Sequence, residues 1–442
     1  MEMSEKWQRA RLIPVVGTAS GREREQRATS ALLAVLSIVR PFSIELLSPL
    51  GASRAARATV DAYVEPPFKA VTGRDVRPDG LIRVRYGNQQ PWTALVEVKT
   101  GTNELTLEQI NAYIECAREH KYDHVITISN QIAPSEGVHP TESLKIRKDA
   151  KVKVSHFSWT RVAAISARVR DRTGIDDVEQ DWILAELIRY LEHQSSGALE
   201  FDDMGPEWTS VKDGARAAAL RRTDPAVLDI ARRWDQLLTF AALKLGIQIG
   251  EEVEEVMPRA HRDDAAVRTK QFARDLSETG VLTGSLRVRN SVGDIDVAAD
   301  LRARRLAIGT TVRAPHDKKA RGSVSWLVKQ LSESPPALEV EAIAKNHSTG
   351  PTAVLGALRD DPTDFYALLD DDVAKLRITW RTDLGTARRG GRGAGFVDSV
   401  LSSLLNYYRT THQRIVAYPS RAPQVTEKGG ATADVELGSQ ED

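Results

Sequence analysis

Hydrophobic positions between residues 77 and 113 change their period, and this stretch organises the N-terminal part of the chain. Apolar residues dominate from Gly80 onward and again from Thr93 to Lys99, and the turn residues Gly87-Asn88 separate the two runs. Runs of this kind on either side of a Gly-Asn pair predict a β-hairpin. After a break at Gly101, the apolar positions take a helical spacing. The pattern therefore predicts a strand, a turn, a second strand and an amphipathic helix.

Further helix and strand patterns surround this stretch. Apolar residues from Glu23 to Val39 form one stripe at helical spacing, and Pro41 is expected to end that helix. The alternation of helices and strands predicts an α/β domain in which helices flank a mixed sheet. The other expected elements are strands at Ile44 to Leu47, Thr59 to Phe68, Lys121 to Asn130 and Val152 to Trp159, and helices at Arg161 to Arg170 and Val178 to His193.

Small and acidic residues from Ser195 to Pro206 predict a domain boundary. Four units are expected: a first domain at 1–195, a linker and helical segment at 196–250, a second α/β domain at 251–425 and a disordered acidic tail at 426–442. The patterns in the second and third units predict helices from Glu207 to Gly246, strands at Val281 to Val288, Asp294 to Leu301 and Leu306 to Val312, and a helix through Trp326 and Leu331.

Composition narrows the class of protein. The chain has 442 residues, 28% of them charged, and a formal net charge of zero, so any contact with nucleic acid must come from local patches. The single cysteine, Cys116, excludes an intrachain disulfide framework and fits a reducing compartment, where it is expected to pack as a small apolar residue. No stretch has the pattern of a signal peptide or a membrane span. We therefore expect a cytoplasmic protein with no membrane partner.

Candidate chemistry gathers at the predicted hairpin. Glu97 and Lys99 share one face of the second strand because side chains alternate along a strand. The hairpin folds Asp79 back toward Glu97, and two converging carboxylates repel each other unless a cation holds them. Carboxylate oxygens suit Mg²⁺ or Mn²⁺. Beside such an ion, Lys99 is placed to orient a water and to stabilise negative charge in a transition state at phosphorus.

This series of residues resembles the PD-(D/E)XK nuclease superfamily. The resemblance rests on Pro78-Asp79, the hairpin, Glu97-Val98-Lys99, Gly101 and a helix that carries Gln109 and Tyr113, a pair similar to the Q-x-x-x-Y element of RecB-like members. It extends at most from Gly21 to Trp159. The resemblance implies a restriction-endonuclease-like fold for the first domain only.

The resemblance also implies an activity and a set of roles. Asp79, Glu97 and the Val98 carbonyl would bind Mg²⁺ or Mn²⁺, with Glu25 of the first helix as a further acidic ligand and Glu23 as its alternative. Gln109 and Tyr113 would support the catalytic residues Asp79, Glu97 and Lys99. The implied reaction is hydrolysis of phosphodiester bonds in DNA, with RNA less favoured. The associated setting is bacterial restriction or phage defence, with a homodimer or a defence-system protein as partner.

Each of these residues also has a structural interpretation. Asp79 before Gly80 suits a turn, and Gln109 suits a capping box with Thr106. Tyr113 is typical of a core residue with its hydroxyl at the edge, and Glu25 is favourable near a helix N-terminus. Glu97 and Lys99 are harder to explain structurally because burying a charged pair is costly. The rival functions are an inactive nuclease-fold scaffold that binds nucleic acid or a partner, and a regulatory interaction protein.

Two basic segments are candidate contacts to nucleic acid. Lys145, Arg147 and Lys148 precede the strand from Val152, where they would track a phosphate backbone or protect a sheet edge. Arg388, Arg389 and Arg392 lie in a glycine-rich loop that has no P-loop signature. Three further alternatives concern structure. Asp202 and Asp203 are expected to be solvated, His156 is expected to be a satisfied core histidine, and the second domain is either unrelated or a degenerate copy with Gly309 and Thr311 in place of Glu97 and Lys99.

Overall fold

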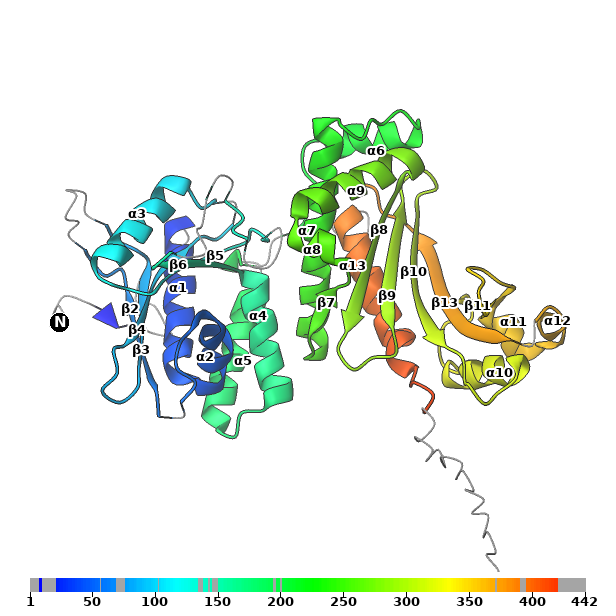
Figure 1. Cartoon of the computed structure of the whole chain (residues 1–442), viewed down its shortest axis with the longest axis horizontal. Helices are drawn as coiled ribbons and strands as arrows, with labels where there is room; N and C mark the ends of the chain where they lie inside the picture. The colour runs from blue at the N-terminus through cyan, green and yellow to red at the C-terminus, as the bar shows by residue number, and fades with distance from the viewer. Residues whose placement is uncertain are drawn as a thin grey trace, which may run out of the picture.

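The computed structural model contains two sheets in two neighbouring domains (Figure 1). We call the elements from β1 to α5 the first domain and those from α6 to η4 the second domain. The structure describes residues 8–9, 21–55, 57–68, 76–101, 103–133, 138–141, 144, 150–193, 196–198, 201–369, 372–389 and 395–419.

The first domain is built on a mixed sheet, as the sequence predicts. Its strands follow the chain order, β1 (Gln8–Arg9), β2 (Thr59–Val64), β3 (Gly80–Arg85), β4 (Trp92–Val98), β5 (His124–Ser129) and β6 (Lys153–Ser158). Neighbours from β1 to β4 are antiparallel, whereas β4, β5 and β6 are parallel. Strand β4 is therefore paired on both sides, and its continuous apolar run is buried on both faces.

Helices cover both faces of this sheet (Figure 1). Helix α3 (Leu107–Glu119) lies on one face, where Tyr113 packs with Leu95. The other face carries α1 (Gly21–Ile38), α2 (Arg40–Leu47), η1 (Ser48–Leu50), α4 (Trp159–Arg168), η2 (Val169–Thr173) and α5 (Val178–Glu192). Because side chains alternate along β4, Val96 and Val98 enter the larger core while Leu95 and Glu97 face the side of α3.

One predicted strand of the first domain is wrong. Residues 44–47 lie in α2, and Pro41 occupies the first turn of that helix instead of simply ending α1. A proline is compatible with a first helical turn because the amide hydrogen that it lacks would have no partner there. The break at the extended residue Val39 turns the chain through 108° and folds α2 back onto the core.

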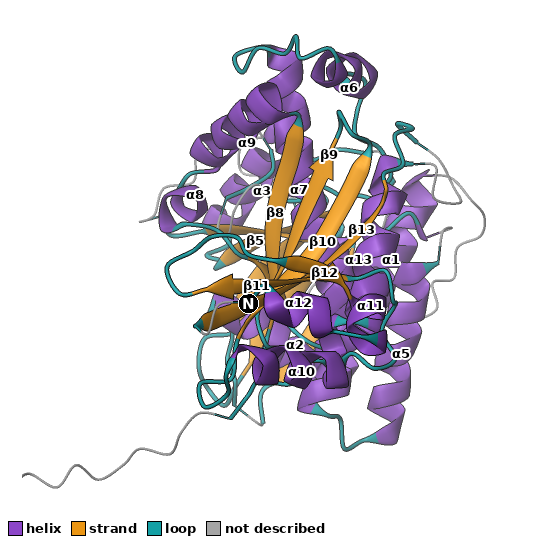
Figure 2. Ribbon diagram, turned by 90° about the vertical axis from the view of Figure 1, so that its right-hand side faces the viewer, coloured by secondary structure: helices purple, strands orange, loops and turns teal. Residues whose placement is uncertain are grey.

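The second domain has a seven-stranded sheet in which all neighbours are antiparallel. Helices α7 and α13 cover one face of β8, β9, β10 and β13 (Figure 2). The predicted strand Val281–Val288 is confirmed at both ends as β8. The elements are α6 (Trp208–Arg216), α7 (Pro225–Ile249), β7 (Val253–Glu255), α8 (Arg259–Asp263), α9 (Ala265–Thr279), β8, β9 (Asp294–Asp300), β10 (Arg305–Arg313), α10 (Ala320–Gln330), β11 (Glu339–Ala344), β12 (Thr352–Val354), α11 (Leu355–Asp360), α12 (Thr363–Ala367), β13 (Val373–Asp383), α13 (Phe396–Thr410) and η4 (His412–Arg414).

The two domains meet where α4 packs against α7. Ile247 of α7 contributes to the core of the first domain, and Arg168 of α4 forms ion pairs with Glu45 and Glu252. Across the described ranges, no single helix is long and apolar enough to cross a membrane, and only the bent pair of α1 with residues 40–50 meets that criterion together.

Candidate functional site

The carboxylate of Glu97 and the ammonium of Lys99 form a close pair at the C-terminal end of β4. Lys99 Nζ lies 2.7 Å from Glu97 Oε1, and the two side chains are 14% and 2% exposed. Burial, the largest single influence, lowers the pKa of Lys99, but the charge and hydrogen bond of Glu97 together with the charges of Asp79 and Glu25 raise it above its ordinary value overall. Lys99 therefore remains an ammonium group at neutral pH.

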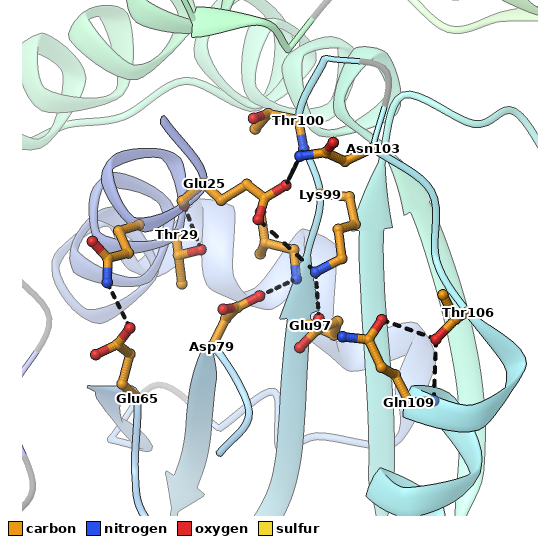
Figure 3. Close-up of polar contacts among 12 residues, drawn as sticks. Glu25, Thr29, Glu65, Asp79, Glu97, Lys99, Thr100, Asn103, Thr106 and Gln109 are labelled. Carbon is orange, nitrogen blue, oxygen red and sulfur yellow. Dashed lines mark hydrogen bonds and ion pairs between the residues drawn. The ribbon is translucent and has the colours of Figure 1, made fainter. Parts of the chain in front are cut away.

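Asp79, the residue immediately before β3, places its carboxylate at the same site (Figure 3). Its Oδ2 accepts a hydrogen bond of 2.8 Å from the backbone N–H of Val98, which fixes the carboxylate beside Glu97. Burial, followed by the Glu97 charge, raises the pKa of Asp79 to about 8. The following residue must be small, since a Cβ at Gly80 would lie 2.5 Å from Leu33 Cδ1 of α1.

Glu25 of α1 supplies a third carboxylate. Its Oε2 lies 3.9 Å from Lys99 Nζ, while its Oε1 accepts hydrogen bonds from the Thr100 backbone at 3.3 Å and from Asn103 Nδ2 at 2.8 Å. Figure 3 shows α1 and β4 directing Glu25 and Lys99 toward each other. The structure thus brings together Asp79, Glu97, Lys99 and Glu25, all of them predicted site residues.

The charges at this site do not balance. Three carboxyl groups surround one ammonium, so full ionisation would leave an excess of two negative charges. With a pKa of about 8, Asp79 is mostly protonated at neutral pH when no cation is bound. Oε2 of Glu97 is buried and accepts no hydrogen bond of good geometry. Such an orphaned oxygen is costly in a protein interior and suits a ligand that the site still has to receive.

The donor set fits a hard divalent cation. Mg²⁺ is often held by only one or two carboxylates because it keeps several of its waters. Asp79, Glu97 and the carbonyl of Val98 would supply such a set. In the described residues, no group of three or more His, Cys, Asp or Glu side chains has the geometry of a metal site. Glu25 does not complete such a group here because its carboxylate binds the Thr100 backbone and Asn103.

Helix α3 brings the last two predicted residues to the site. The Tyr113 hydroxyl faces Glu97, and burial together with the Glu97 charge raises the pKa of Tyr113 well above its ordinary range. Gln109 has the structural role that the sequence offered as an alternative. Thr106 caps the helix, its Oγ1 accepting from the Gln109 backbone at 3.3 Å while its hydroxyl donates to Gln109 Oε1 at 3.1 Å.

A hydrogen-bonded chain next to Glu97 had no signal in the sequence. Thr127 is the register partner of Glu97 on β5, and its Oγ1 lies 2.8 Å from His139 Nε2 and 3.0 Å from His156 Nδ1. His139 Nδ1 accepts from the Thr141 backbone N–H at 3.0 Å, and His156 Nε2 donates to the carbonyl of Gln131 at 2.8 Å. Burial lowers the pKa of His139 to about 4 and that of His156 to about 3. Both histidines are therefore neutral, so His139 Nε2 donates to Thr127 and His156 Nδ1 accepts from it. The prediction that His156 is satisfied is confirmed, because both of its ring nitrogens have partners, although its side chain is only half-buried.

The predicted basic contacts have mixed outcomes. Lys145, Arg147, Lys148 and Arg392 lie outside the described residues. Arg388 and Arg389 are described, and both guanidinium groups are paired with Asp203 at 2.7 and 2.8 Å. Asp203 is only 14% exposed, so the expectation that it is solvated was wrong. Asp203 and Arg388 are 185 residues apart in the sequence, so no local pattern could predict their contact.

The single cysteine has no place in the site. Cys116 is buried in the small core under α3, and burial raises its pKa to about 12. A thiol with so little thiolate is a poor nucleophile. Its predicted role as a packing residue is confirmed.

Comparisons with protein-family models, with curated proteins and with solved structures found no match to this chain. The function is therefore inferred from the geometry of the site.

Proposed function

We propose that this chain is a metal-dependent nuclease of the PD-(D/E)XK kind, which hydrolyses phosphodiester bonds in DNA. The observation that carries the proposal is the convergence of Asp79, Glu97 and Lys99 at the end of β4, with Glu25 approaching from α1. The order of these residues and the mixed sheet between helices both agree with the superfamily that the sequence resembles. Restriction or phage defence in the cytoplasm is the proposed setting, with a homodimer or a defence-system protein as candidate assembly.

Each residue has a defined part in this proposal. Asp79, Glu97 and the Val98 carbonyl would hold Mg²⁺ or Mn²⁺, which when bound would act as a Lewis acid toward a phosphoryl oxygen. Lys99 would orient the attacking water and stabilise the charge that develops on the phosphate. Tyr113 would hold the buried carboxylate of Glu97 in place. The influence of Glu97 on the pKa of Tyr113 supports this role because it shows that the two groups lie close together.

The second candidate function is an inactive nuclease-fold scaffold that binds nucleic acid. Two observations favour it. The ion pair with Lys99 occupies one carboxylate oxygen of Glu97, a proposed metal ligand, and the described side chains contain no group of three metal-ligating residues. A scaffold would bind DNA in a salt-dependent manner that Glu97→Gln does not weaken.

The test is cleavage of circular and linear DNA, single- and double-stranded, and of RNA, in Mg²⁺, Mn²⁺ or EDTA. The variants are Glu97→Gln and Lys99→Met, with Glu115→Gln on the exposed side of α3 and Lys151→Met, also exposed, as matched controls. Metal-dependent cleavage lost in the first two variants and kept in the controls would support the proposal. Binding without cleavage in every condition would support the scaffold. The absence of both binding and cleavage would exclude both functions.

A further inference from the structure

The three residues that follow β4 have every backbone polar group paired. Lys99 N–H donates to the carbonyl of Ile128 at 2.8 Å, and the Lys99 carbonyl accepts from Trp159 Nε1 at 2.9 Å. Thr100 N–H donates to Glu25 Oε1 at 3.3 Å. These partners come from β5, α4 and α1, so three separate elements hold the backbone of Lys99 and Thr100.

The remaining groups are held by the loop itself and by the start of the connection to the second domain. The Thr100 carbonyl accepts from Asn103 N–H at 3.3 Å. Gly101 N–H donates to the carbonyl of Gly197 at 2.9 Å, and Asn130 Nδ2 donates to both the Gly101 carbonyl at 3.0 Å and the Gly197 carbonyl at 2.6 Å. Asn130 therefore ties the loop after β4 to residues 196–198, which follow α5.

The close approach at this point requires a glycine. Gly197 has φ +64°, and a Cβ there would lie 3.2 Å from Gly101 N. Ser196, its neighbour, is buried and donates to the Leu191 carbonyl of α5 at 3.2 Å. Residues 196–198 are thus anchored to the first domain at the point where the chain leaves for the second one.

We propose that Asn130 and Gly197 are positioning residues for Lys99, and that the start of the interdomain connection is part of the scaffold of the catalytic site. This inference rests on the nuclease function proposed above. Without the two hydrogen bonds of Asn130, the Gly101 end of the loop is held only by the bond from Gly101 N–H to the Gly197 carbonyl. This end should then move more, and Lys99 Nζ should be held less precisely against Glu97. Neither residue touches the carboxylates, so they act only through the backbone of residues 99–101.

The same arrangement links the site to the second domain. Trp159, which holds the Lys99 carbonyl, is the first residue of α4, and α4 packs against α7 of the second domain. Gly197 holds the other end of the loop. A displacement of the second domain would therefore reach Lys99 from both sides.

The test uses the full chain and the substitution Asn130→Asp, which keeps the shape of the side chain but places a carboxylate oxygen against two carbonyls. The control is Asn406→Asp, on an exposed position of α13. Gly197→Ala serves as a milder second variant if Asn130→Asp fails to fold. Two quantities are measured: kcat and KM for DNA cleavage, and hydrogen exchange in peptides that cover residues 98–103.

The expected result for Asn130→Asp is a fall in kcat on the order of 100-fold, the typical effect of an ångström-scale misplacement, with little change in KM. Exchange of the Gly101 amide should accelerate in the same variant, and Asn406→Asp should change neither quantity. A folded variant with wild-type kcat, or with unchanged exchange at Gly101, would overturn the inference. If the wild-type protein cleaves no nucleic acid, the proposed function fails, and a positioning role for catalysis fails with it whatever the exchange shows.

Discussion

Replacing Lys99 by methionine should destabilise the cation-free protein far more than an exposed Lys→Met change. The Lys99 side chain is 14% exposed and lies 2.7 Å from Glu97 and 3.9 Å from Glu25, whose side chains are 2% and 12% exposed. Removing one member of a buried ion pair costs about 3–5 kcal/mol because it leaves an uncompensated charge behind. Here the variant retains three carboxyl groups without a cation. Asp79, with a pKa of about 8, is mostly protonated at neutral pH and relieves part of the repulsion, so we expect a loss within that range.

A divalent cation should reverse much of this loss. A ligand that binds only the folded state stabilises it by about 2.7 kcal/mol at a concentration 100 times its dissociation constant. The excess of negative charge is larger in Lys99→Met than in the wild type, so the variant should gain more from Mg²⁺ or Mn²⁺. The double variant Glu97→Gln/Lys99→Met should regain stability in EDTA and respond weakly to the cation.

The assay is urea unfolding followed by circular dichroism in EDTA, Mg²⁺, Mn²⁺ and K⁺ at matched ionic strength. Lys151→Met is the control for loss of an exposed lysine. Equal stability of Lys99→Met and Lys151→Met in EDTA would contradict the burial of the charge. Absence of any stabilisation by divalent ions beyond that of K⁺, in both the wild type and Lys99→Met, would refute the cation site itself.

Three further predictions concern stability. Burial lowers the pKa of His139 to about 4 and that of His156 to about 3 from 6.5, so the unfolded chain takes up protons first as the pH falls, and each histidine should lower the free energy of unfolding by about 2 kcal/mol at pH 5. In the His→Gln variants the urea midpoints at pH 7 and pH 5 should move closer together, and an unchanged pH dependence would contradict this. Arg268→Leu should lower the stability in thermal unfolding by about 3–5 kcal/mol because Asp235 stays buried without its partner. Adding Asp235→Leu in the same chain should restore most of that stability, and no recovery in the double variant would contradict the buried ion pair. Gly80→Ala should lower the free energy of unfolding by about 1–3 kcal/mol because the added methyl group overpacks against α1. A urea midpoint equal to that of the wild type would show that α1 moves to accommodate the methyl group.

The sequence predicts the part of the site that is local in the chain. Alternation along β4 places Glu97 and Lys99 on one face, and the hairpin returns Asp79 to their side. Both signals arise within about twenty residues because strand period and turn residues are local properties. For the same reason, the ends of β8 are predicted correctly.

The remaining site residues depend on contacts between distant segments. Glu23 and Glu25 are equivalent in the sequence, and only packing of α1 directs Glu25 toward Asn103, 78 residues away. Asn130 reaches Gly197 across 67 residues, and neither belongs to a motif. The error at residues 44–47 has a local cause, since a short apolar run does not distinguish a strand from a buried helix.

The two features of the site, its excess of negative charge and its fully paired loop, are connected. Buried carboxylates repel each other in the cation-free protein and would push the end of β4 apart if the loop were free to relax. Of the six backbone groups of residues 99–101, five bind neutral partners, and one binds Glu25. Those five partners carry no charge that a cation would alter, so we expect the loop to keep its shape with and without the cation. The proposed nuclease would therefore hold Lys99 in its working position before the cation arrives.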